Sequence, residues 1–246
     1  MRLKLTIDRG NSAVKAAVWH DDRIIATDIF HSDYAEEIAA FARSNGRNGR
    51  FDSAIYSSVG DRADDIVEAV GALSDRVIEL TSQTPMPLTL DYRTPSTLGC
   101  DRIAAAVGAR VVAPGRWLLV VDCGTAVTYD LVSPDGRFVG GNIAPGIFMR
   151  LEALNRFTAR LPLVETDGDT PLRGYDTETA LRSGAVMGVV AEIEYNRRHM
   201  PSPDAATVIT GGQAALVADK VAFDSVVEPN LVSIGLNRII DYNENI

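Results

Sequence analysis

Cysteine and histidine are scarce in this chain: its 246 residues include two cysteines and three histidines. Cys100 and Cys123 form no CxxC pair and have no metal-ligand spacing with the histidines, so the sequence predicts no structural zinc site. Two cysteines also give no framework of secreted disulfides, and we interpret both as reduced thiols of a cytoplasmic protein. The histidines form no pattern with Ser, Cys or Asp that would indicate a nucleophilic triad.

Long apolar runs and excess positive charge are also lacking. No apolar run approaches the roughly 18 residues that cross a bilayer, and the chain starts in a strand pattern without an apolar leader. The net charge is −9, and such a surface repels the phosphates of nucleic acids and of anionic membranes. We therefore expect neither as a partner, and a nucleotide site would need locally placed cations.

The two common nucleotide fingerprints, GxxxxGK[ST] and GxGxxG, are absent. What the sequence has instead is a repeat of another motif about half a chain apart. Asp8–Lys15 follows the apolar run Leu3–Ile7, and Asp122–Thr128 follows Leu118–Val121. Each reads as a strand, then Asp-x-Gly-polar, then a second strand. Glycine lets the backbone of such a turn approach a phosphate closely.

A plain β-turn also favours Asp, Gly and Asn, but turn chemistry does not explain why both the motif and its setting are repeated. Two such turns facing each other would hold a nucleoside triphosphate and its metal. In the first copy, Asn11 and Ser12 can donate to phosphate oxygens, and Lys15 can bring a positive charge to the same face. Asp8 can hold Mg²⁺ directly or through water.

Three further segments have both a functional and a structural interpretation. Gly140–Gly146 precedes a predicted helix, which suits an anion site or a tight connection. Asp101 falls in the first turn of an Ala-rich helix that starts near Gly99, where the helix dipole favours the carboxylate. It could accept a proton from a substrate hydroxyl or serve helix stability alone. Gly211-Gly212 fits either an adenine or ribose contact or a simple turn.

The order of predicted elements is duplicated. Each half opens with three consecutive strands and continues with helices and further strands, which predicts two similar α/β domains, 1–113 and 114–246. The predicted strands are 3–7, 13–19, 23–30, 54–57, 118–121, 126–132, 137–143 and 207–210. The predicted helices are 33–43, 61–73, 99–110, 146–157, 176–198 and 231–241.

With these residues the chain resembles the type III pantothenate kinases, a branch of the actin, sugar-kinase and heat-shock chaperone ATPase superfamily. The resemblance rests on IDRGNSAVK, TPSTLGCDRIAAAVGA, VVDCGTAVTYDLVSPDGRFVGGNIAPG and LNRFTARLP, which follow the family's order and span almost the whole chain. It implies two ribonuclease H-like domains with the active site in the cleft between them. It also implies ATP-dependent phosphorylation of pantothenate, the first step towards coenzyme A.

The resemblance assigns roles residue by residue. Asp101 matches the catalytic base, and Asp122 resembles the ligand of a monovalent cation, potassium or ammonium, needed beside Mg²⁺. Thr125 looks like a second nucleotide contact. The ATP-phosphate loop corresponds to Asp8, Arg9, Gly10, Asn11, Ser12, Ala13, Val14 and Lys15. The pantothenate contacts correspond to Tyr92, Gly99, Cys100, Asp101, Arg102 and Thr177. The family is dimeric, so a homodimer is implied.

Some positions depart from the family pattern or leave a choice. Arg9 replaces a small or apolar residue, and its side chain should point away from the face of Asp8. Cys100 stands where small apolar residues are usual, and Thr179 is an alternative to Thr177. Two other functions remain in view: another small-molecule kinase of the same superfamily, and a non-catalytic accessory factor in gene regulation. The intact set Asp8, Lys15, Asp101 and Asp122 argues against an inactive protein.

Overall fold

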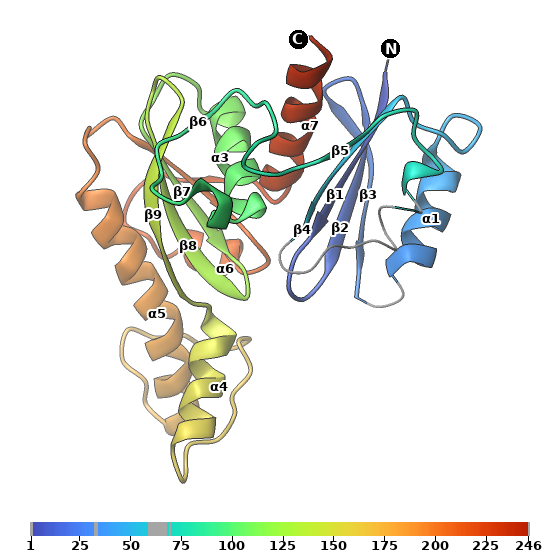
Figure 1. Ribbon diagram of the computed structural model, residues 1–246. Helices are drawn as coiled ribbons and strands as arrows, with labels where there is room; N and C mark the ends of the chain where they lie inside the picture. Colours follow the sequence, from blue (N-terminus) through green and yellow to red (C-terminus); the bar gives the residue numbers. More distant parts are fainter. Residues whose placement is uncertain (1, 32–33, 59–67, 69, 246) are drawn as a thin grey trace. The chain divides into compact units, whose positions relative to one another are not determined.

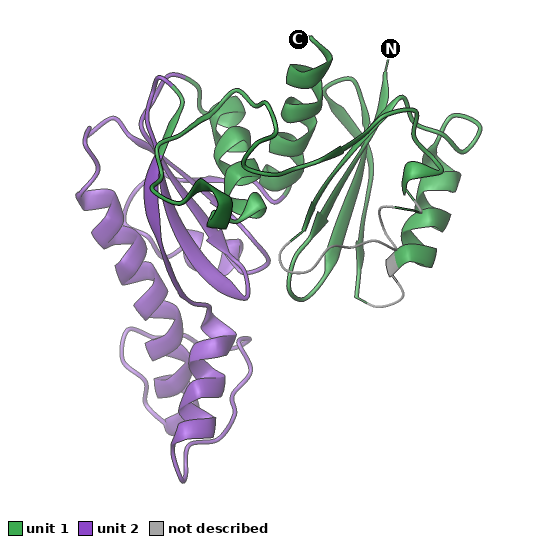
Figure 2. Ribbon diagram, viewed as in Figure 1, with its two compact units in different colours: residues 1–114, 136–138, 230–246 green, residues 115–135, 139–229 purple. Residues whose placement is uncertain are grey.

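The computed structural model describes residues 2–31, 34–58, 68 and 70–245. It divides into two compact units, which are coloured separately in Figure 2. The first comprises residues 1–114, 136–138 and 230–246, and the second comprises residues 115–135 and 139–229. The C-terminal segment therefore belongs to the first unit. Among the described residues, no helix has the length and apolarity needed to span a membrane.

A five-stranded sheet forms the centre of the first unit, with the strand order β3-β2-β1-β4-β5 (Figure 1). The strands are β1 (Leu3–Arg9), β2 (Val14–His20), β3 (Arg23–Phe30), β4 (Ser53–Ser58) and β5 (Val77–Glu79). β1 and β2 are antiparallel, as are β2 and β3, whereas β4 runs parallel to β1 and β5 runs parallel to β4. This unit also holds α1 (Tyr34–Asn45), β6 (Thr89–Leu90), the 3₁₀ helix η1 (Pro95–Thr97), α3 (Cys100–Val112) and α7 (Leu231–Glu244).

Another sheet has the order β11-β10-β7-β8-β9-β6. Its strands besides β6 are β7 (Leu118–Cys123), β8 (Ala126–Val132), β9 (Arg137–Pro145), β10 (Ala206–Thr210) and β11 (Val226–Val227). β6 pairs with Arg137 and Phe138 at the start of β9, and both partners are counted with the first unit. The second unit also contains α4 (Ile147–Phe157), α5 (Thr177–Arg198) and α6 (Ala214–Ala218).

The two sheets repeat one topology. β3-β2-β1-β4-β5 in the first sheet corresponds to β9-β8-β7-β10-β11 in the second. In both, the first strand of the half is central, antiparallel to the next strand and parallel to a later one. The expected duplication is therefore present in strand order, and the predicted mixed α/β fold with two similar parts is confirmed.

Each unit has an apolar cluster of its own. In the first, the odd-numbered residues Leu3, Leu5 and Ile7 of β1 pack with Ile38 and Ala42 of α1. The alternation of strand side chains therefore directs Lys4, Thr6 and Asp8 to the opposite face of β1. In the second unit, the buried side of α5 packs against β7 and β8.

The structure confirms the main sequence-based elements and extends most of them by one to three residues. The prediction of a helix over 61–73, and of a helix start at Ser32 or Asp33, falls largely outside the described residues. The described elements that the sequence did not reveal are β5, β6, η1, α6 and β11, each between two and five residues long. The domain division at residues 113 and 114 stays a prediction; the contact-based units assign residues 136–138 and 230–246 to the first unit.

Candidate active site

The first Asp-x-Gly turn joins β1 to β2 in the first unit. The amide of Gly10 donates to the carbonyl of Ala13 at 3.0 Å and closes the turn, whose exposed tip is Asn11 and Ser12. The strand register places Lys15 directly opposite Asp8. Side chains directly opposite across a strand pair share one face, so a carboxylate and an ammonium group flank the base of the turn.

Asp8 is a buried carboxyl group with one hydrogen-bond partner and two charged neighbours. The hydroxyl of Ser57, beside it on the parallel strand β4, donates to Asp8 Oδ1 at 2.7 Å. Burial and the negative charge of Asp101 together raise the pKa of Asp8 from 3.8 to about 6. The Ser57 hydrogen bond and the positive charge of Lys15 oppose this rise. A carboxylate held against desolvation and a like charge gains most from an added cation.

Asp101 occupies the first turn of α3, where the helix dipole favours a negative charge. Its Oδ1 accepts a hydrogen bond from the amide of Arg102 at 2.8 Å. A Cβ at Gly99 would lie 2.3 Å from Asp101 Oδ1, so glycine lets the carboxylate keep this position at the helix start. Asp101 and Asp8 therefore belong to one charged cluster within the first unit, together with Lys15 and Ser57.

The predicted pantothenate contacts on either side of Asp101 are arranged around a residue that the sequence did not single out. Phe138 has an edge-on contact with Tyr92, with 5.9 Å between ring centroids, and the guanidinium of Arg102 lies 5.5 Å from its ring. Phe138 reaches this position because β9 pairs with β6, next to Tyr92. Only long-range strand pairing brings these three side chains together.

The environment of Cys100 lowers the reactivity of its thiol. Its Sγ donates to the carbonyl of Leu80 at 3.0 Å, and burial, with the nearby charge of Asp101, raises the pKa of the thiol to about 11. Burial also raises the pKa of Cys123 to about 12. Both thiols stay protonated near neutral pH, so neither acts as a nucleophile.

The second Asp-x-Gly turn lies in the second unit and has different neighbours. Gly124 donates to the carbonyl of Ala126 at 3.1 Å, and Gly146, which precedes α4, donates to the carbonyl of Thr125 at 3.1 Å. A Cβ at Gly146 would lie 2.3 Å from that carbonyl oxygen, and one at Gly211 would lie 2.4 Å from Asp122 Oδ1. Gly146 and Gly211, one glycine from each of the two glycine motifs of the sequence, are thus required for close packing around this turn, whereas Gly140 and Gly212 have open space around them.

Thr177 is the exposed first residue of α5, in the second unit. The alternative, Thr179, is buried and belongs to a capping box: its amide and hydroxyl donate to Asp176 Oδ1 at 2.8 and 2.7 Å. Its hydroxyl also accepts from the amide of Asp176 at 3.2 Å. Thr179 therefore serves the helix start, which favours Thr177 as the residue available to a ligand.

The geometry allows a cation to be held but does not form a protein-only metal centre. In the described part of the chain, no group of three or more His, Cys, Asp or Glu side chains could hold a metal ion. Magnesium in kinases is bound by one or two carboxylates together with substrate phosphates, and Asp8 suits that mode. Around Asp122, backbone carbonyls and a carboxylate offer the oxygen ligands that an alkali cation prefers.

Solved structures share this fold at low sequence identity. A Campylobacter jejuni protein described as a candidate Baf family transcriptional activator aligns with a TM-score of 0.66 and 22% identity, covering 98% of this chain and all of that one. A candidate 2-dehydro-3-deoxygalactonokinase from Sinorhizobium meliloti aligns with a TM-score of 0.62 and 13% identity, covering 99% and 100%. The duplicated sheets, each with an Asp-x-Gly turn after its central strand, are the fold that this chain shares with these structures.

Sequence comparison identifies the branch. The family model of type III pantothenate kinase matches residues 4–199. A type III pantothenate kinase of Porphyromonas gingivalis strain W83 is 38% identical over 251 residues, covering 99% of this chain and 100% of the relative. One from Phocaeicola vulgatus is 37% identical over 247 residues, covering 99% and 100%. The chain belongs to the type III pantothenate kinase family, and the resemblance expected from its motifs is confirmed.

Proposed function

We propose that this protein transfers the γ-phosphoryl group of ATP to the hydroxyl of pantothenate, giving 4′-phosphopantothenate in the first step of coenzyme A biosynthesis. Family membership across the full chain gives the reaction. The observation that carries the mechanism is the cluster of Asp8, Lys15, Ser57 and Asp101 within the first unit. Phosphoryl transfer needs positioning and charge neutralisation more than covalent chemistry, and this cluster offers both.

Asp101 is the proposed general base. The amide of Arg102 orients its carboxylate, which lies at the positive end of the α3 dipole. It would accept the proton of the pantothenate hydroxyl as that oxygen attacks phosphorus. Tyr92, Gly99, Cys100 and Arg102 would contact pantothenate beside it, and Thr177 would contribute a hydroxyl from the start of α5. The neutral thiol of Cys100 limits its role to packing or a weak hydrogen bond.

The turn Asp8–Lys15 is the proposed grip on the triphosphate. Asn11, Ser12 and the turn amides would donate to phosphate oxygens, and Lys15 would offset negative charge. Arg9 follows Asp8 on β1, so its side chain points to the other face of the strand. It would contribute through its backbone. Thr125, exposed at the second turn, is the proposed further nucleotide contact.

Two cations complete the proposal. Magnesium bound with ATP would neutralise the charge of Asp8 and the phosphates, and a monovalent cation, potassium or ammonium, would bind at Asp122. The oxygen-rich surroundings of these two carboxylates support the assignment. In this mechanism Lys15 would bind the triphosphate, Ser57 would orient Asp8, and Asp101 would take the proton.

We also propose a homodimer acting in the cytoplasm. Helix α4 exposes large apolar side chains that water solvates poorly, among them Phe148 at 45% and Phe157 at 82%. Such a group on one helix is typical of a protein interface. The acidic surface continues to argue against nucleic acid as a partner.

The decisive experiment measures pantothenate-dependent ADP release with Mg²⁺ in potassium buffer and identifies the phosphorylated product by mass spectrometry. Asp101→Asn should lower kcat by roughly 10²- to 10⁴-fold with the fold intact, the usual effect of removing a positioned base. Asp75→Asn is the matched control, because Asp75 is an exposed carboxylate paired with Arg50. Near wild-type turnover by Asp101→Asn would remove the base assignment.

The two alternatives give different results in the same assay. Faster ADP release with a hexose than with pantothenate would indicate another small-molecule kinase of the superfamily. No detectable phosphoryl transfer, together with a specific protein partner, would favour the non-catalytic accessory factor.

A further inference from the structure

One charged side chain of the first unit is almost completely buried and has no part in the proposed chemistry. Lys4, near the start of β1, is 1% exposed, and its Nζ donates to Asp241 Oδ1 of α7 at 2.6 Å. A buried ion pair adds little net stability compared with apolar side chains of similar volume, because both charges lose their hydration. What it does impose is a defined geometry between the two elements that it joins.

The ion pair and the candidate active site lie on the same face of the sheet. Lys4, Thr6 and Asp8 alternate to one face of β1, and the parallel register places Ser53 beside Lys4 and Ser57 beside Asp8. Four residues of extended strand put Lys4 about 13 Å from Asp8 along β1. Asp8 therefore stands at one end of this row of polar residues. Lys4, at the other end, binds helix α7.

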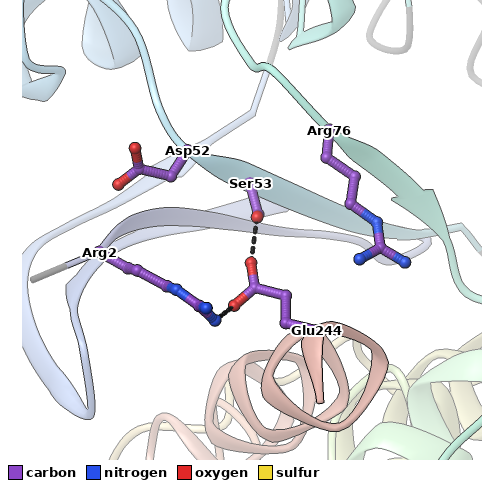
Figure 3. A pocket seen from close by; sticks show the side chains of 5 residues that line it. All are labelled: Arg2, Asp52, Ser53, Arg76 and Glu244. Carbon is purple, nitrogen blue, oxygen red and sulfur yellow. Dashed lines mark hydrogen bonds and ion pairs between the residues drawn. The ribbon is translucent and has the colours of Figure 1, made fainter. Parts of the chain in front are cut away.

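The end of the sheet that contains Lys4 makes a second contact to helix α7. Glu244, at the end of α7, accepts a hydrogen bond from the Ser53 hydroxyl and forms an ion pair with Arg2, as Figure 3 shows. These residues line a pocket of about 360 Å³ together with Asp52 and Arg76. Arg76 adds a hydrogen bond from its guanidinium to the carbonyl of Asn243 at 3.1 Å. The end of α7 is thus fixed to β1, to β4 and to Arg76, which directly precedes β5.

The helix α7 is in turn packed tightly against α3, which carries Asp101. A Cβ at Gly235 would lie 1.8 Å from the carbonyl oxygen of Ala104, and a Cβ at Gly108 would lie 2.1 Å from that of Leu231. Glycines on both helices therefore permit backbone-to-backbone contact. Ala104 is three residues, about 4.5 Å along the helix axis, from Asp101. A shift of α7 relative to the sheet would move the point at which α7 contacts α3. Asp101, on α3, would move with it.

We propose that Lys4 and Asp241 are positioning residues of the active site: their ion pair fixes α7 on β1, and α7 fixes α3 so that Asp101 stands at the correct distance from Asp8. This role rests on the proposed function of Asp101 and Asp8. The pair acts through helix placement and touches neither substrate. A displacement of about 1 Å between reacting groups can cost about 100-fold in rate, so a small shift is sufficient.

The test compares kcat, KM for ATP and the urea midpoint of wild type, Lys4→Met, and the double variant Lys4→Met/Asp241→Leu. Removing one partner leaves a buried charge unpaired, whereas the double variant replaces both charges with apolar groups and should recover the urea midpoint. We expect kcat to fall at least tenfold in both variants, with KM for ATP within threefold of wild type. Leu3→Ala is the matched control: Leu3 is buried next to Lys4 but faces the cluster under α1. It should lower the urea midpoint and leave kcat per folded molecule within twofold.

Recovery of the midpoint without recovery of kcat supports positioning, because a purely structural role would restore both. A folded double variant with kcat within twofold of wild type would overturn the proposal, as would an equal loss of kcat in Leu3→Ala. Wild-type turnover is measured first. If the wild type transfers no phosphate to pantothenate, the proposed function fails and the positioning role fails with it. If the wild type is active and the folded double variant keeps its kcat within twofold, only the positioning role fails.

Discussion

The raised pKa of Asp8 predicts that the free protein is destabilised by a carboxylate to which the proposed function assigns a role. Burial and the charge of Asp101 raise this pKa from 3.8 to about 6. In the unfolded chain the carboxylate ionises freely. A folded-state pKa above the unfolded value gives stability that is present below pH 3.8 and is lost as the pH rises through about 6. Above that range, folding has to hold an ionised carboxylate in an unfavourable site.

The size of the effect follows from the same shift. One pKa unit corresponds to about 1.4 kcal/mol, so ionised Asp8 costs the folded protein about 3 kcal/mol when neither metal nor nucleotide is bound. Asp8→Asn removes the ionisation and keeps an oxygen for the Ser57 hydroxyl, which donates at 2.7 Å. We expect the variant to be inactive and, at neutral pH, more stable than wild type by about 2 to 3 kcal/mol.

The assay is urea unfolding at a series of pH values from 4 to 8, without metal or nucleotide. Trp19 is buried in β2 of the first unit, and its indole N–H donates to Thr6 at 3.0 Å. Trp117 belongs to the second unit, so a Trp117→Phe background makes the fluorescence report on the first unit. A free-energy difference of 2 to 3 kcal/mol corresponds to a midpoint shift of about 1 to 3 M urea.

The pH dependence is the discriminating result. The midpoints of Asp8→Asn and wild type should be close at pH 4, separate between pH 4 and 6, and stay separated above pH 7. Asp22→Asn, which removes an exposed carboxylate from the same unit, should show no such separation. Parallel curves for wild type and Asp8→Asn across the whole range would refute the argument that the ionised carboxylate is strained in the free protein.

Three further results are expected. Replacing potassium or ammonium with sodium should abolish turnover, and equal rates in all three salts would contradict the role of Asp122. Gly235→Ala should destabilise the protein by at least about 2 kcal/mol in urea, because its Cβ would lie 1.8 Å from the Ala104 carbonyl oxygen. The control Gly184→Ala, in α5, has open space for the new Cβ and should be neutral or stabilising by up to about 1 kcal/mol. Asp176→Ala should cost about 1 kcal/mol through loss of the α5 capping box, while Thr177→Ala should leave stability unchanged and raise the KM for pantothenate.

Local sequence patterns were sufficient for the strands and turns that form the first part of the site. The alternation in Leu3–Ile7 and the Asp-x-Gly turn predicted both the hairpin of β1 and β2 and the placement of Lys15 on the face of Asp8. The hairpin register follows from a short turn between two adjacent segments, so no distant information was needed. The helix that begins at Cys100 was equally visible, because its Ala-rich run has a clear start at Gly99.

Long-range pairing accounts for what the sequence did not reveal. Ser57 reaches Asp8 only because β4 runs parallel to β1 in one particular register, and its own neighbours give no sign of that. Phe138 meets Tyr92 and Arg102 through the pairing of β6 with β9, and β6 is too short for a periodic pattern. Lys4 occupies what looks like a solvent-facing position of an alternating strand, and the packing of α7 buries it.

The membership of α7 in the first unit has a consequence for synthesis on the ribosome. Residues 115–135 and 139–229 can assemble while the chain is still growing, but the first unit lacks its partner for Lys4 and for the backbone of α3 until residues 230–246 emerge. Domains made of contiguous chain tend to fold in the order of translation. Here β1, β4 and α3 gain their contacts with α7 only after the residues of the second unit have been synthesised, so Asp101 takes its final position late in translation.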